Sequence, residues 1–139
     1  MANSPNGDLD GLLVISLEQA VAAPYAASRL ADAGARVIKV ERPEGDFARG
    51  YDADAKGHSS YFVWLNRGKE SVALDLKQPD DLKIFKQMLS KADVFIQNLM
   101  PGALDRLGVS MADLRQADRR LITCDISGYG ASGPFAQMK

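Results

Sequence analysis

The stretch LLVISLEQAVAAPYAASRLADAGARVIKVE, residues 12–41, determines the fold class. It begins with an apolar run, residues 12–15, of the kind found in strands that are buried on both faces. Small residues and leucine over residues 24–33 favour a helix, and Gly34 supplies a left-handed cap at its end. Residues 36–41 predict a second strand. This strand, helix, strand order is typical of a parallel β-α-β unit.

The rest of the chain continues the alternation. Further strands are predicted at residues 71–76, 93–97 and 121–126, and further helices at 101–107, at 110–117 and from Pro79 onward. Residues 43–60 show no regular periodicity and predict a long, functional loop, whereas residues 61–66 fit either a helix or a strand. The whole pattern predicts one α/β domain over residues 1–139, with a mostly parallel sheet and helices on both faces.

Composition narrows the possible functions. Lys and Arg number 17 and Asp and Glu number 18, so a general attraction to nucleic acid or to an anionic membrane is not expected. One cysteine and one histidine are too few for a disulfide framework or a tetrahedral zinc site, so no metal is expected. No apolar run approaches the ~20 residues that span a bilayer. The first ten residues contain no Lys or Arg, which predicts a cytoplasmic protein rather than a targeted one.

The ends of the predicted strands carry the candidate site. In a parallel sheet, ligands bind beyond the carboxyl ends of the strands. No Gly-x-Gly-x-x-Gly turn or Gly-x-x-x-x-Gly-Lys-Ser/Thr loop occurs there, which argues against the commonest nucleotide sites. Instead, the predicted strand ends are followed by polar and basic residues, which are Arg42, Lys77, Asn98 and Arg106. This pattern predicts a site for a multiply anionic ligand. Each of these residues taken alone is equally typical of a solvated surface position.

Three other reactive residue types have weaker cases. His58 lies in the long loop without an identifiable partner, so we expect a solvated histidine. Cys124 lies inside a predicted strand, where a buried and inert thiol is expected. Ser127 is not within a Gly-x-Ser-x-Gly nucleophile turn, so it is not expected to be catalytic.

Ordered segments along the chain resemble the amino-terminal part of family III CoA-transferases, the CaiB/BaiF group. The matching segments are AAP (22–24), LADAGARVIKVERP (30–43), LNRGK (65–69), SVALDLK (71–77), ADV (92–94), Asn98, PGALDRLG (101–108), ISGYG (126–130) and GP (133–134). No single segment is decisive, but the ordered set is highly specific. It covers nearly the whole chain.

The resemblance implies a Rossmann-like domain that binds coenzyme A, in a family known for interlocked homodimers. The family's CoA contacts fall on Val21, Ala22, Arg42, Leu74, Asp75, Leu76, Lys77, Asn98, Leu99, Met100, Arg106 and Lys139. The four cations in this set suit a diphosphate and a ribose phosphate, and Leu74, Leu76 and Met100 suit an adenine ring. Transferases of the formyl-CoA type have a glutamine where this chain has Val21.

The implied reaction moves CoA from an acyl-CoA to a carboxylic acid through an aspartyl mixed anhydride and an enzyme–CoA thioester. The family's aspartate lies beyond Lys139, so we interpret the chain as an amino-terminal portion that is inactive alone. Two alternatives stay open. One is part of a 2-methylacyl-CoA racemase, against which the presence of Lys139 counts slightly, and the other is a catalytically silent CoA-binding module.

Overall fold

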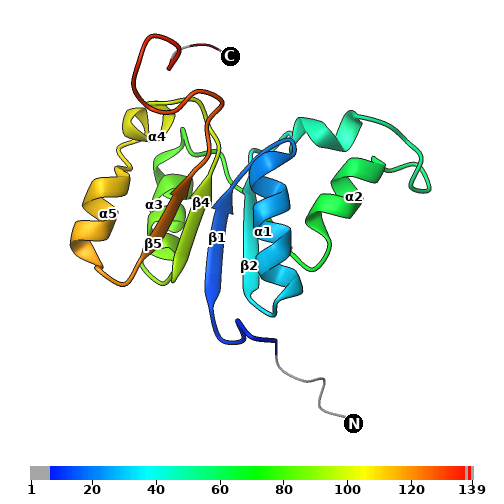
Figure 1. Cartoon of the computed structure of the whole chain (residues 1–139), viewed down its shortest axis with the longest axis horizontal. Helices are drawn as coiled ribbons and strands as arrows, with labels where there is room; N and C mark the ends of the chain where they lie inside the picture. Colours follow the sequence, from blue (N-terminus) through cyan, green and yellow to red (C-terminus); the bar gives the residue numbers. More distant parts are fainter. Residues whose placement is uncertain (1–6, 137, 139) are drawn as a thin grey trace.

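The computed structural model describes residues 7–136 and residue 138. Its centre is a five-stranded sheet in the order β3-β2-β1-β4-β5, and every neighbouring pair is parallel (Figure 1). The strands are β1 (Leu13–Leu17), β2 (Arg36–Glu41), β3 (Glu70–Ala73), β4 (Val94–Gln97) and β5 (Ile122–Asp125). The predicted α/β class with a parallel sheet is therefore confirmed.

Helices cover both faces of the sheet (Figure 1). The helices are α1 (Ala22–Asp32), α2 (Ser60–Asn66), α3 (Pro79–Leu89), α4 (Ala103–Arg106) and α5 (Met111–Ala117), with a short 3₁₀ helix, η1, at Phe47–Gly50. On one face, α1 packs its alanines against Val14, Val37 and Ile96. On the other face, residues of α3, α4 and α5 enclose a larger core, in which the rings of Phe85 and Phe95 meet edge to face at 5.9 Å. The two-faced burial explains why the strands are short apolar runs.

Two strand ends differ from the sequence prediction by more than one residue. β1 extends two residues beyond Ile15, because Ser16 and Leu17 pair with β2 on one side and with β4 on the other, and the buried Ser16 hydroxyl donates a hydrogen bond to Glu18. β3 ends at Ala73 instead of residue 76. There the N–H of Asp75 donates to the carboxylate of Asp81, and the Asp75 carboxylate accepts the N–H of Lys77, so the chain turns away from the sheet.

The long predicted loop contains local structure. Asp46 caps η1 by accepting the N–H of Ala48, and Ser59 caps α2 by accepting the N–H of Phe62. Residues 61–66, which fitted either a helix or a strand, therefore belong to a helix. Their helix packs beside α1, on the same face of the sheet.

Cys124 is partly buried, because its strand lies at the edge of the sheet, so the expectation of a buried thiol was wrong. His58 is exposed, as expected. Among the residues that the structure describes, no helix is long and apolar enough to cross a membrane.

Candidate functional site

Two adjoining hollows lie at the carboxyl ends of the strands. The first hollow, of about 210 Å³, lies beyond β1, β2 and β3. It is lined by Leu17, Glu18, Val40, Glu41, Arg42, Gly45, Asp46, Leu74, Asp75, Leu76, Lys77, Leu99 and Leu107. Pockets that enclose a drug-sized ligand measure roughly 300–1,000 Å³, so the first hollow is suited to one flat portion of a larger molecule.

The second hollow, of about 310 Å³, lies beyond β1, β4 and β5. It is lined by Gln19, Ala22, Asn98, Leu99, Met100, Pro101, Ile126, Ser127, Gly128 and Met138. Leu99 lines both hollows, so the two adjoin. An elongated ligand that occupied both would cross the turn between β1 and α1.

Most of the predicted binding residues line one of these hollows. Those in the first hollow are Arg42, Leu74, Asp75, Leu76 and Lys77; those in the second are Ala22, Asn98 and Met100; and Leu99 belongs to both. Val21 and Arg106 line neither hollow in the described part of the chain. Lys139 lies outside the described residues.

The cations differ in how closely they approach the first hollow. Arg42 and Lys77 both line it, and the exposed Arg42 guanidinium donates to the carbonyl of Gly45 at 2.9 Å. Arg106 is exposed on α4, and one of its terminal nitrogens lies 3.3 Å from where a Cβ on Gly102 would be. Its neighbour Leu107, not Arg106 itself, reaches the first hollow.

Asn98 holds the turn between β1 and α1 in place. Its side-chain oxygen accepts the N–H of Gln19 at 2.9 Å, and its side-chain nitrogen donates to the carbonyl of Gln19 at 2.8 Å. Both polar groups of the amide are thus used on one backbone unit. Asn98 shapes the second hollow by fixing this turn.

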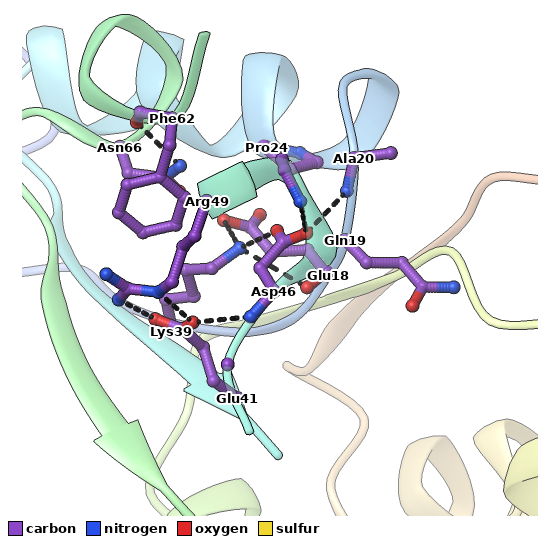
Figure 2. A network of polar contacts seen from close by, with 12 residues as sticks. Glu18, Gln19, Ala20, Pro24, Lys39, Glu41, Asp46, Arg49, Phe62 and Asn66 are labelled. Carbon is purple, nitrogen blue, oxygen red and sulfur yellow. Dashed lines mark hydrogen bonds and ion pairs between the residues drawn. The ribbon is translucent and has the colours of Figure 1, made fainter. Parts of the chain in front are cut away.

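A buried group of charged side chains lies behind the first hollow (Figure 2). Lys39 donates to the carboxylate of Asp46 at 2.8 Å, and its Nζ lies 3.6 Å from the carboxylate of Glu18. Lys69 donates to the same oxygen of Glu18 at 2.5 Å. The side chains of both lysines are only 1% exposed, and those of the two carboxylates are fully buried. We call Glu18, Lys39, Asp46 and Lys69 the buried ion network.

The buried ion network holds loops as well as charges. The second oxygen of Asp46 accepts the N–H of Ala20 at 3.2 Å, and Ala20 has a positive φ of 63° that its neighbours must maintain. Lys69 also donates to the carbonyl of Pro24 at 2.9 Å. Burial lowers the pKa of Lys69, while the charge and hydrogen bond of Glu18 oppose that shift.

Glu41 forms a second cluster at the rim of the buried ion network. Arg49 grips its carboxylate with two nitrogens, at 2.7 and 2.9 Å, and Ser71 donates to it at 2.7 Å. Burial alone would raise the pKa of Glu41, but these bonds and the N–H of Asp46 outweigh it and lower the pKa to about 2. The Arg49 guanidinium also stacks over the ring of Phe62, 3.8 Å from its centroid.

The sequence patterns did not indicate the buried ion network. Its one visible signal was Lys39, which lies between Ile38 and Val40 in a strand that is paired with another strand along each edge. A lysine in such a strand must find a carboxylate. Which carboxylates it meets depends on two loops, and so could not be predicted from the spacing alone.

The chemistry of the first hollow suits an amphipathic anion. Leucine and valine side chains form its apolar wall, and Arg42 and Lys77 lie at its lining. An apolar ring would be buried against the leucines while a phosphate pairs with the cations. Among residues 7–136 and 138, no group of His, Cys, Asp or Glu side chains is arranged to hold a metal ion.

Comparison with known protein families gives a match over most of the chain. The model of CoA-transferase family III matches residues 9–139. The chain is 45% identical over 133 residues to acetyl-CoA:oxalate CoA-transferase of Acetobacter aceti, covering 95% of this chain and 34% of that protein. It is 39% identical over 131 residues to human succinyl-CoA:glutarate CoA-transferase, covering 93% and 30%.

A solved structure agrees with these sequence matches. The fold is similar to that of a CaiB/BaiF family protein from Brucella suis, with a TM-score of 0.88 and 37% identity over 96% of this chain and 36% of that one. The chain therefore spans about a third of the length of the relatives that it matches.

Proposed function

This chain belongs to CoA-transferase family III, and we propose that it forms the CoA-binding part of an enzyme that moves CoA from an acyl-CoA to a carboxylic acid. The observation that carries this proposal is the first hollow, where leucines and the cations Arg42 and Lys77 lie together. This combination suits the adenine and phosphate groups of CoA. Leu74, Leu76 and Leu99 would contact the ring.

The second hollow would take the part of CoA that leads toward the thioester. It adjoins the first hollow through Leu99 and contains the fixed turn after β1. A turn held on both sides loses little further freedom when a ligand binds. Ala22 and Met100 would line this path.

The transfer itself would follow the chemistry that the family resemblance implies. An aspartate that lies after residue 139 in the family's chain order attacks the acyl-CoA thioester, giving a mixed anhydride and CoA thiolate. The thiolate attacks the aspartyl carbonyl and releases the donor acid, leaving an enzyme–CoA thioester. The acceptor carboxylate then attacks that thioester, which gives a second mixed anhydride and releases CoA thiolate. The thiolate attacks the acceptor's acyl carbon, which forms the new acyl-CoA and frees the aspartate carboxylate. One thioester replaces another, so the free energy changes little.

The substrate class follows from the relatives. The names of the two curated relatives pair an acyl-CoA with oxalate or glutarate, which makes short dicarboxylic acids the first acceptors to test. Both relatives are named CoA-transferases, which favours a transferase over a racemase. In this proposal the complete enzyme is a homodimer, as the resemblance implies.

Calorimetry of CoA binding tests the proposed site. We expect Arg42→Ala to weaken CoA binding to the 139-residue chain roughly ten- to a hundredfold, because a lost charge-assisted phosphate contact is worth roughly 1.5–3 kcal/mol. Arg119→Ala is the matched control, since Arg119 is exposed at the opposite end of the sheet, before β5 begins. Equal effects of the two substitutions, or no CoA binding by the unsubstituted chain, would overturn the proposal.

A further inference from the structure

Acidic residues outnumber basic residues in the lining of the first hollow. Glu18, Glu41, Asp46 and Asp75 contribute to it, against Arg42 and Lys77. The side chains of Glu18 and Asp46 are fully buried and that of Glu41 is 3% exposed, so these carboxylates lie just behind the wall. CoA carries a diphosphate and a ribose phosphate, which negative charges so close to the hollow would repel if nothing balanced them.

Cations behind the wall reverse this balance. Lys39 contacts Asp46 and Glu18, and Arg49 contacts Glu41 (Figure 2). Lys69 also contacts Glu18. None of the three cations lines the first hollow in the described chain. Arg49 is half exposed, but the lysine side chains are 1% exposed, so a ligand cannot touch them.

The lysines can therefore act on a ligand only through the carboxylates that they neutralise. We propose that Lys39 and Lys69 are positioning residues for CoA: buried counter-ions that give an acidic hollow an electrostatic potential that accepts a polyanion. This inference rests on the proposed function. The inference extends the proposed function in one respect: CoA binding depends on two lysines that the ligand cannot touch. Loss of either lysine would convert the hollow into one that repels phosphate.

The network's geometry makes the charge effect separable from a packing effect. One oxygen of Asp46 accepts the N–H groups of Ala20 and Ala48, and the other meets Lys39. An asparagine at residue 46 keeps the first oxygen and removes the charge. Lys39→Met with Asp46→Asn is thus a near-isosteric neutral pair, whereas Lys39→Met alone leaves one carboxylate without its cation.

We expect Lys39→Met to bind CoA about tenfold more weakly than the unsubstituted chain at pH 8, as one uncompensated charge near the hollow implies.

The control variant and a neutral ligand make the test specific. Lys39→Met/Asp46→Asn should recover most of the CoA affinity that Lys39→Met loses. Adenosine, which has the base but no phosphate, should bind all three proteins with similar affinity. A loss shared by adenosine, or a failure of the neutral pair to restore CoA binding, would show a merely structural role and overturn the inference.

A second pair keeps the test decisive if Lys39→Met does not fold by circular dichroism. Lys69→Met leaves Glu18 without its closest cation, and Lys69→Met/Glu18→Gln restores neutrality while residue 18 can still accept from Ser16. The same outcomes apply to this pair. If the unsubstituted chain bound no CoA, the proposed function would fail; if it bound CoA and the variants matched it at pH 8, only the inference would fail.

Discussion

At the residue scale, Glu41 shows how one carboxylate joins stability to the shape of the first hollow. It ends β2, and it accepts hydrogen bonds from Arg49, Ser71 and the N–H of Asp46. These bonds favour the ionised form in the folded protein, where its pKa is about 2, below its ordinary value of 4.5. The stabilisation is therefore complete above about pH 4.5 and is lost as the pH falls toward 2.

We expect Glu41→Gln to flatten the acid limb of the stability curve. The substituted chain should be less stable at pH 7, because Arg49 and Ser71 lose a charged partner, and its free energy of unfolding should fall less steeply between pH 4.5 and 2. Urea unfolding at a series of pH values measures this. The exposed Glu44 provides the control Glu44→Gln. An acid limb as steep as that of the unsubstituted chain would contradict the assignment.

At the scale of single elements, the end of α1 depends on a glycine. Gly34 has a φ of +101°, and a Cβ placed there would lie 2.8 Å from the Cα of Gly7. The N–H of Gly34 donates to the carbonyl of Ala31, which closes the helix before β2 begins. The sequence analysis predicted this cap. It could not show that the chain before β1 packs against the same turn.

Gly34→Ala should destabilise the fold by at least about 1–2 kcal/mol, the typical cost of a left-handed conformation for a residue with a Cβ. The close contact with Gly7 adds to that cost. Gly50→Ala is the matched control, because a Cβ there meets nothing within 4 Å and its φ is not positive. Chemical denaturation of both variants gives the comparison. Equal stabilities would show that the turn relaxes around the new methyl group.

At the scale of the whole molecule, the carboxylates around the first hollow are already in use. Glu18 and Asp46 pair with lysines, Glu41 pairs with Arg49, and Asp75 accepts the N–H of Lys77. A carboxylate held by a cation is a poor nucleophile. In the proposed function, the described part of the chain therefore binds CoA and does not attack its thioester; it spans about a third of its relatives' length.

We expect the 139-residue chain to bind CoA but to transfer none. Incubation with acetyl-CoA or succinyl-CoA and with oxalate or glutarate, followed by chromatography of the CoA esters, would measure this. A full-length relative such as the Acetobacter aceti enzyme is the positive control. Turnover by the chain alone would show that one of its own residues is the nucleophile, and would contradict the order of events that we propose.

The amino-acid sequence alone determined the alternation of strands and helices and the parallel sheet. Apolar runs, an alanine-rich helix and glycine caps act within a few residues, so they can be interpreted from local spacing. It also placed Arg42 and Lys77 at strand ends that meet in one hollow. The early end of β3 was missed, because it depends on a hydrogen bond from the N–H of Asp75 to the carboxylate of Asp81 that competes with the sheet.

Only the tertiary structure decided how the charges are shared. Glu18, Lys39, Asp46 and Lys69 come from four separate segments, and no periodicity connects them. A buried charge must be paired, but the choice of partner is made by the loops that bring the carboxylates to it. The same holds for Asn98, whose amide contacts the backbone of Gln19, 79 residues earlier in the chain.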